Sequence, residues 1–242
     1  MTSIIAAFQF LTIFPTLIKR MFTSQEIGRS VGWFPLVGVT LGALLYGVNH
    51  FAQRLFPASV AAALTIFAWV FFTRAFHLDG LMDTCDGLFG GFTPERRLEI
   101  MKDSRMGAFG MVGGVLVLLM EYTALASSSA PLPALVISTT LGRWAPPLVI
   151  YAFPYAREDG LGIEMKRNVG LPQVILATAI TFIVSWFVYG TMGLWLMLFA
   201  TLVVFLVALY IMRLIPGLTG DSYGAITTII EVLVLLFFAI QR

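Results

Sequence analysis

The residues best suited to chemistry in this chain are three aspartates, Asp79, Asp83 and Asp86, spaced four and three positions apart. On a helix with about 100° per residue they fall within about 60° of one another, which predicts one acidic face. Like charges on one face repel, so this face indicates a cationic partner. Clustered carboxylate oxygens favour Mg²⁺. The alternative is a solvated acidic face, against which the hydrophobic neighbours of these aspartates argue.

A second charged cluster follows at Lys102, Asp103 and Arg105. Two acidic clusters joined by a turn-rich loop could hold one or two divalent ions against the phosphates of a nucleotide-like substrate. Lys102 and Arg105 are suited to binding phosphate oxygens where negative charge develops. We therefore predict four metal ligands: Asp79, Asp83, Asp86 and Asp103.

Two later loops carry further candidates. Arg157, Gly160 and Gly162 share one loop, where glycine backbone can approach a phosphate closely, although an ordinary polar loop would look the same. Asp221 lies between glycines just before the last apolar segment, either as a helix N-cap or as a group that contacts a ligand or a substrate hydroxyl. The predicted catalytic set is Asp103, Asp221, Lys102 and Arg105, with Asp103 or Asp221 as the general base.

Two residues in apolar surroundings remain open to two interpretations. Arg143 lies within an apolar run, where leaving it unpaired would cost several kcal/mol. It either pairs with Glu121 or Glu231 or reaches a ligand phosphate. His77 borders the acidic triad as a structural hydrogen-bonding residue or as a substrate contact. The predicted substrate-binding set is Arg157, Arg143, His77, Gly160 and Gly162.

The elements that position these residues are those of a membrane protein. The 242 residues are 59% hydrophobic and 12% charged, with a mean hydropathy of +0.91, which excludes an ordinary soluble domain. We expect an all-α, polytopic helix bundle forming one membrane-embedded domain over residues 1–242. About seven segments are long enough to span a bilayer. They are residues 31–52, 58–76, 107–127, 132–153, 171–189, 192–214 and 225–240.

Two segments outside these spans complete the expected architecture. The run 4–18 is shorter, contains Pro15 and is followed by Lys19 and Arg20, which favours an interfacial helix over a signal peptide. The polar stretch 77–106 is long enough to indicate a functional loop. The lone Cys85 allows no intrachain disulfide.

The basic residues are distributed unequally across this expected topology. If the first loop is cytoplasmic, only Arg54 and Arg242 lie on the opposite side, and Arg143 lies within a span. The positive-inside rule then places the chemistry at the cytoplasmic face. The cytoplasmic set is Lys19, Arg20, Arg29, Arg74, Arg96, Arg97, Lys102, Arg105, Arg157, Lys166, Arg167 and Arg213.

Four motifs resemble one family over essentially the whole chain. They are FHLDGLMDTCDG (76–87), IMKDSRMG (100–107), YAREDGLG (155–162) and TGDSYGA (219–225). In order and spacing they are similar to those of the adenosylcobinamide-GDP ribazoletransferase, or cobalamin synthase, family. Met82 and the pair Ser222-Tyr223 depart from the family pattern, which affects the fit of the substrate more than the reaction class.

The resemblance implies a transferase that needs Mg²⁺ and acts in cobalamin biosynthesis at the bacterial inner membrane. A hydroxyl of α-ribazole or of its 5′-phosphate would attack adenosylcobinamide-GDP and release GMP, giving adenosylcobalamin or its 5′-phosphate. The carboxylates that match the family motifs are Asp79, Asp83, Asp86 and Asp103. We expect contact with membrane lipid and no nucleic-acid partner, and an oligomer is compatible with the sequence.

Two other functions compete with this interpretation. A CDP-alcohol phosphotransferase of lipid synthesis also arranges aspartates on membrane helices for Mg²⁺, but its motif carries an Arg after Asp-Gly-x-x-Ala that Asp79-Gly80 lacks here. A cation transporter could use the aspartates as an ion site. Transporter sites lie near the bilayer midplane, often between repeated halves, and this sequence shows no evident repeat.

Overall fold

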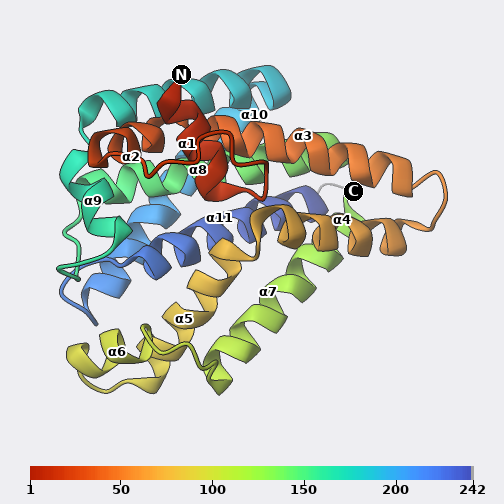
Figure 1. Cartoon of the computed structure of the whole chain (residues 1–242). Coiled ribbons are helices and arrows are strands. Elements are labelled where there is room, and N and C mark those ends of the chain that lie inside the picture. Colours follow the sequence, from red (N-terminus) through yellow and green to blue (C-terminus); the bar gives the residue numbers. More distant parts are fainter. Residues whose placement is uncertain (241–242) are drawn as a thin grey trace.

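The computed structural model describes residues 1–240, and helices account for its regular structure (Figure 1). Within that range the only extended pairing is a single bridge between Tyr155 and Leu218. The elements are α1 (Thr2–Leu11), α2 (Ser24–Ser30), η1 (Val31–Trp33), α3 (Phe34–Ala52), α4 (Ala58–Thr73), α5 (Phe76–Gly90), α6 (Pro94–Ile100), α7 (Ala108–Ser127), α8 (Pro131–Ala152), α9 (Leu161–Asn168), α10 (Leu171–Met212) and α11 (Gly220–Ile240).

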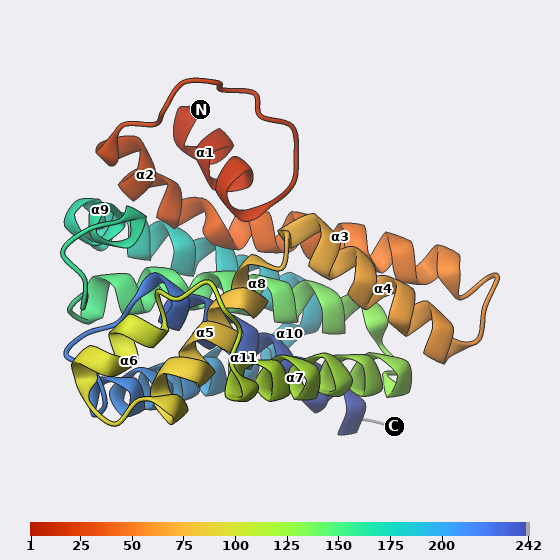
Figure 2. The ribbon, with the colours of Figure 1, turned by 60° about the horizontal axis from the view of Figure 1, so that its bottom comes forward.

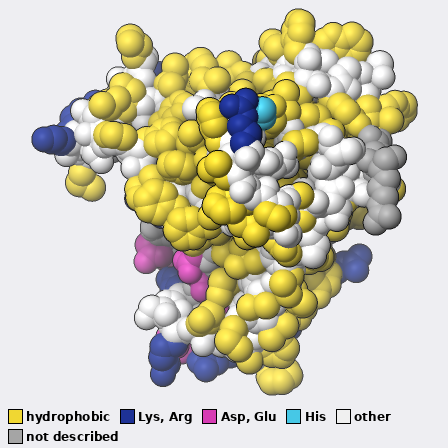
Figure 3. Space-filling view, turned by 90° about the vertical axis from the view of Figure 1, so that its right-hand side faces the viewer, with side chains coloured by type: hydrophobic (Ala, Val, Ile, Leu, Met, Phe, Trp, Pro, Cys, Tyr) yellow, Lys and Arg dark blue, Asp and Glu magenta, His cyan; other side chains and the backbone are white. Residues whose placement is uncertain are grey.

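Several of these helices are long and apolar enough to cross a membrane, which confirms the all-α membrane class but not the count of seven spans. Four helical stretches in residues 1–240 meet the requirement, or five if one bent pair counts as a span. They are Ser24–Ala52, Ala108–Ser127, Leu171–Met212 and Gly220–Ile240, with Ala58–Thr73 plus Phe76–Gly90 as the bent pair. Figure 3 shows a face covered mostly by hydrophobic side chains, whose visible acidic groups lie in its lower half.

The predicted span 132–153 is α8, which is the central helix of the bundle. It contacts α3, α10 and α11, and buries most of its length. Because neighbouring helices cover it, α8 tolerates Arg143, several hydroxyl residues and two internal prolines, and its mixed composition keeps it out of the apolar candidates.

The predicted spans 171–189 and 192–214 are two arms of α10. Tyr189 and Gly190 leave helical geometry at the kink, and Gly190 has a positive φ of 58°. A Cβ added to Gly193 would collide with the carbonyl oxygen of Ser185, so the chain folds back beside the kink. Glycine at 190 and 193 permits the conformation and the close approach.

Helix α5, which carries the three aspartates of the first motif, is bent sharply away from α4. Arg74 and Ala75 both adopt the left-handed conformation, each with φ of 55°, which non-glycine residues rarely adopt. The resulting bend between α4 and α5 is 87°. The Arg74 guanidinium donates to the carbonyl oxygen of Phe10 at 3.0 Å, which ties the bend to α1. Figure 2 shows α1 lying outside the main bundle, between the amino-terminal loop and α3.

Candidate active site

The site begins where α5 crosses the start of α11, and two glycines make this crossing close. A Cβ at Gly80 would lie 2.9 Å from the backbone oxygen of Asp221 and 3.3 Å from Cα of Gly224. A Cβ at Gly224 would lie 3.1 Å from the backbone oxygen of His77. Because no side chain separates the two backbones, Asp79 on α5 comes close to Asp221 on α11.

A cavity of about 620 Å³ opens beside this crossing. Its polar part includes Asp79, Asp221, Arg157, Lys102 and Asp159, and its other walls are mainly apolar and aromatic. The volume lies within the range of about 300–1,000 Å³ that is usual for small-molecule sites. The remaining lining residues are Phe10, Leu11, Phe34, Phe76, His77, Gly80, Pro146, Ile150, Tyr155, Gly160, Leu161, Gly162, Met165, Gly220, Tyr223 and Gly224.

A short backbone pairing brings the two glycine-rich loops together at the mouth of the cavity. The amide of Ala156 donates to the oxygen of Leu218 at 2.8 Å, and the amide of Leu218 donates to the oxygen of Pro154 at 2.9 Å. This pairing places the Arg157 guanidinium 2.7 Å from the carboxylate of Asp221. The structure thus joins two candidate residues that are 64 positions apart in the sequence.

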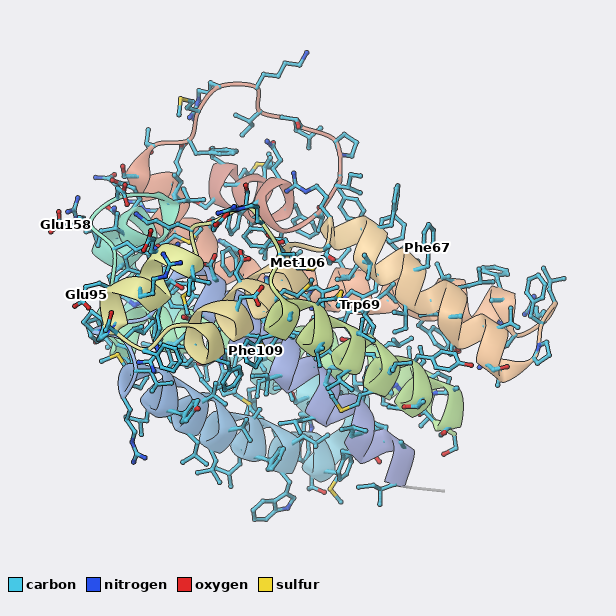
Figure 4. All side chains as sticks on the ribbon, turned by 90° about the horizontal axis from the view of Figure 1, so that it is seen from below. Phe67, Trp69, Glu95, Met106, Phe109 and Glu158 are labelled. Carbon is cyan, nitrogen blue, oxygen red and sulfur yellow. The ribbon has the colours of Figure 1, made fainter. Side chains whose placement is uncertain are left out.

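Lys102 reaches the same cavity from a different segment. Its ammonium group lies 3.5 Å from the carboxylate of Asp159, and both side chains are largely exposed. Figure 4 shows Glu95 on α6 and Glu158 in the loop before α9 at the same end of the molecule. Lys102 and Arg157 therefore supply two cationic groups to one polar rim, which suits an anionic ligand.

Asp83 lies on α5 and does not itself line the cavity, and the charged groups that act on it are mostly acidic. Asp83 is half-buried and interacts electrostatically with Asp79, Asp221 and Asp86, with Arg157 as the cation that acts on it. Hard carboxylate oxygens with uncompensated charge fit a divalent cation such as Mg²⁺. However, no three His, Cys, Asp or Glu side chains in residues 1–240 are assembled closely enough to form a metal site as they stand.

Asp86 has a different environment from the other two aspartates of the triad. Its carboxylate accepts hydrogen bonds from the amides of Gly107 and Gly110, at 2.7 and 2.8 Å, and so binds the N-terminus of α7. A Cβ at either glycine would collide with this carboxylate. At 1.5 Å per residue, Asp79 and Asp86 are about 10 Å apart along α5, so the shared face meets α11 at one end and α7 at the other. In the structure Asp86 therefore caps α7, and its role as a metal ligand stays a prediction.

We expect Asp86→Ala to lower stability, because two amides at the start of α7 lose a charged acceptor. Loss of a single helix cap costs about 0.5–2 kcal/mol. The measurement is the apparent midpoint of thermal unfolding in detergent. Asp86→Asn, which keeps one acceptor oxygen, should lie between the wild type and Asp86→Ala, and an unchanged midpoint in both variants would contradict the capping role.

Asp103 and Arg105 form a local ion pair instead of extending the acidic cluster. The Arg105 guanidinium donates to the Asp103 carboxylate at 2.7 Å, and neither residue lines the cavity. The hydrogen bond from Arg105 lowers the pKa of Asp103 to about 2. A carboxylate with so low a pKa is a weak base near neutral pH, so this arrangement does not favour the general-base prediction for Asp103. The roles of Asp103 as a metal ligand and of Arg105 at a phosphate stay predictions.

The depressed pKa predicts how this ion pair depends on pH. The pair should contribute fully above the ordinary pKa of 3.8 and be lost as the pH falls through about 2. In the variant Arg105→Gln, the midpoint of Asp103 titration should rise towards 3.8. Carbon-13 NMR of the labelled carboxylate in micelles measures both midpoints, and equal values would show that the pair does not form in solution.

Arg143 lies behind the cavity and does not line it. It is 1% exposed and pairs with Glu231 on α11, around a small cavity that Glu121 also lines. Its guanidinium lies 3.4 Å from Nδ1 of His77, and His77 lines both cavities. The structure thus favours ion pairing over the predicted substrate contact for Arg143, whereas it leaves His77 at the wall of the site.

Gly160 and Gly162 lie at the site as predicted. Gly160 has a positive φ of 92°, and Gly162 packs directly against the ring of Tyr155, where a Cβ would collide with it. Burial raises the pKa of the Tyr155 hydroxyl, which keeps it a neutral hydrogen-bonding group. These glycines therefore shape the loop that carries Arg157.

The aromatic part of the site was not predicted from the motifs. Tyr155 and Tyr223 lie with their ring centroids 6.1 Å apart, although they come from different motifs. Asp159 was also missed as the partner of Lys102. The motifs already contained all three residues, but only the fold shows that they meet.

The fold and the site together define an all-helical membrane protein with an acidic and basic rim around one apolar-walled cavity. The chain belongs to the cobalamin-5-phosphate synthase family, whose family model matches residues 3–239. The family resemblance seen in the four motifs is confirmed, and the chain is an enzyme of the transferase class.

Curated relatives agree with this assignment along their full length. The chain is 36% identical to a protein of Desulforamulus reducens, covering 100% of this chain and 97% of the relative. It is 38% identical to one of Desulfitobacterium hafniense (95% and 93%) and 37% identical to one of Pseudomonas fluorescens (97% of each). Each of the three is named adenosylcobinamide-GDP ribazoletransferase. No solved structure matches the chain.

Proposed function

We propose that this enzyme joins adenosylcobinamide-GDP to α-ribazole or α-ribazole 5′-phosphate at the cytoplasmic face of a bacterial inner membrane. A ribose hydroxyl attacks the phosphorus on the cobinamide side of the diphosphate. A new P–O bond forms, the bond to the bridging oxygen breaks, and GMP leaves with that oxygen and its electron pair. The names of the relatives support the choice of substrates. The unequal distribution of Lys and Arg across the expected topology supports an active site at the cytoplasmic face.

The residues at the rim of the cavity have two different roles in this reaction, phosphate binding and proton acceptance. Lys102 and Arg157 bind phosphate oxygens and stabilise the charge that develops on the leaving phosphate. Asp221 accepts the proton of the attacking hydroxyl, since it lines the cavity and Arg157 orients its carboxylate. Asp221 takes this role in preference to Asp103, which is paired with Arg105 outside the cavity.

Asp79 and Asp83 are the residues that would hold Mg²⁺. When bound, the ion supplies neutralisation of phosphate charge and orientation of the diphosphate. The excess of carboxylates over cations around Asp83 supports this assignment, and Asp86 is left out because both of its oxygens bind the start of α7.

The main support for this proposal is the contact between Arg157 and Asp221 in a cavity that Asp79 and Asp159 also line. The experiment follows GMP release from adenosylcobinamide-GDP by the purified protein, with and without Mg²⁺ and α-ribazole. We expect release only when all components are present. Consumption of CDP-diacylglycerol instead, or ion flux in liposomes without GMP release, would overturn the proposal in favour of the lipid enzyme or the transporter.

A further inference from the structure

The cavity has two chemically different parts, and the proposed reaction uses only one of them. The charged rim carries Asp79, Asp221, Arg157 and Lys102. The apolar part of the lining, here called the apolar wall, has no assigned role. It consists of Phe10, Phe34, Phe76, Pro146, Ile150 and Met165.

The apolar wall contains a cluster of aromatic rings. The ring of Phe10 lies 5.0 Å from that of Phe76 in an edge-on arrangement and 6.0 Å from that of Phe34 in a stacked one. The three residues come from α1, the start of α3 and the start of α5, and the bond from Arg74 to the carbonyl oxygen of Phe10 holds α1 in place. A flat aromatic ring can pack against such a surface with little loss of freedom on binding.

We propose that the apolar wall binds the base of the acceptor nucleoside, so that its ribose hydroxyl points at the charged rim. The inference rests on the proposed function, because it identifies which part of which substrate fills the cavity. The base of α-ribazole is a bicyclic benzimidazole with an apolar outer edge, which suits six apolar side chains. Guanine carries several hydrogen-bonding groups, and burying these without partners is costly.

The dimensions of the cavity agree with this placement. A volume of about 620 Å³ accommodates one nucleoside-sized ligand, whereas a corrinoid nucleotide is several times larger and must lie mostly outside. The attacking group therefore sits within the protein and the corrinoid approaches from the mouth, where Lys102 is exposed.

The Tyr223 hydroxyl provides an independent observation. The residue is 6% exposed and lines the cavity, yet its hydroxyl has no hydrogen-bond partner among residues 1–240. A buried hydroxyl without a partner is costly, and a ligand on the apolar wall supplies an acceptor or donor to it. Because Tyr223 is two positions from Asp221 on α11 and both line the cavity, the ribose is the part of the nucleoside expected to reach it.

The test separates acceptor binding from donor binding. The variants are Phe10→Ala, which removes a ring from the apolar wall, and Leu161→Trp, which fills the cavity from a half-exposed position. The matched control is Phe67→Ala, a residue on α4 that is 69% exposed and lies far from the charged end of the molecule (Figure 4). KM is measured for α-ribazole, for its 5′-phosphate and for adenosylcobinamide-GDP, and binding of α-ribazole is measured without turnover by its own fluorescence.

We expect Phe10→Ala to raise the KM and Kd of α-ribazole and of its 5′-phosphate about five- to tenfold. The KM of adenosylcobinamide-GDP should stay unchanged in this variant, and all constants should stay unchanged in the control Phe67→Ala. Leu161→Trp should abolish acceptor binding. A raised KM for the donor alone would place the guanosine in the cavity, and unchanged acceptor binding in both variants would also overturn the inference. If the wild type binds α-ribazole saturably but releases no GMP, the proposed function is contradicted, whereas the inference that the apolar wall binds the base is not.

Discussion

Asp221→Asn should reduce turnover by about 10²–10⁴-fold, the usual contribution of a general base. Asparagine keeps the size of the side chain and one oxygen that Arg157 can still bind at the position of the present 2.7 Å contact. It cannot accept a proton from the ribose hydroxyl. The loss should therefore appear in kcat, measured as GMP release, with little change in the KM of the acceptor.

The control for Asp221→Asn is Glu95→Gln, an exposed acid in the first turn of α6. It removes one negative charge from the end of the molecule where Glu158 also lies (Figure 4), so a loss of activity in this variant would indicate a general electrostatic effect. The thermal unfolding midpoints of both variants should stay close to that of the wild type. If Asp221→Asn retains wild-type kcat, Asp221 is not the base.

Arg143→Met should cause the largest loss of stability, about 3–5 kcal/mol, since removing one partner of a buried ion pair leaves the other charge uncompensated. Arg143 is 1% exposed and pairs with Glu231 across the interface of α8 and α11. The measurement is the yield of monodisperse protein together with its apparent unfolding midpoint in detergent.

A second substitution tests whether the loss comes from this pair. Arg143→Met combined with Glu231→Gln should recover part of the stability, because the uncompensated carboxylate is removed while Glu121 remains at the same small cavity. Additive losses in the double variant would show that the two side chains do not interact. Unchanged KM values in a folded Arg143→Met protein would show that Arg143 does not contribute to substrate binding.

The helical class and the location of the site could be predicted from the sequence because both depend on local patterns. Apolar segments mark membrane helices by length alone, and the four motifs supplied Asp79, Arg157, Asp221 and the two loop glycines, all of which line the cavity. Local patterns could not predict which group each charged side chain contacts in the folded protein. Asp86 and Asp103 match the motifs as well as Asp79 does, yet one caps α7 and the other pairs with Arg105.

The exact number of spans is a point that length and composition leave open. The predicted span 132–153 forms the central helix α8, which is largely covered by neighbouring helices and whose mixed composition keeps it out of the apolar candidates. The two apolar runs 171–189 and 192–214 form two helices that meet at a kink, where Tyr189 and Gly190 leave helical geometry. The bend before α5 had no sequence signal, because Arg74 and Ala75 are not residues that favour left-handed backbone.

The glycine crossing of α5 and α11 gives the enzyme a fixed pivot. With Gly80 against the backbone of Asp221 and Gly224 against that of His77, the backbones of the two helices are in close contact at this point. A bilayer that thickens or thins will therefore change the tilt of α11 about this point, while the separation of the acids beside it stays nearly constant. The enzyme should thus keep its turnover across lipids of different acyl-chain length, even where the tilt of its outer helices adapts.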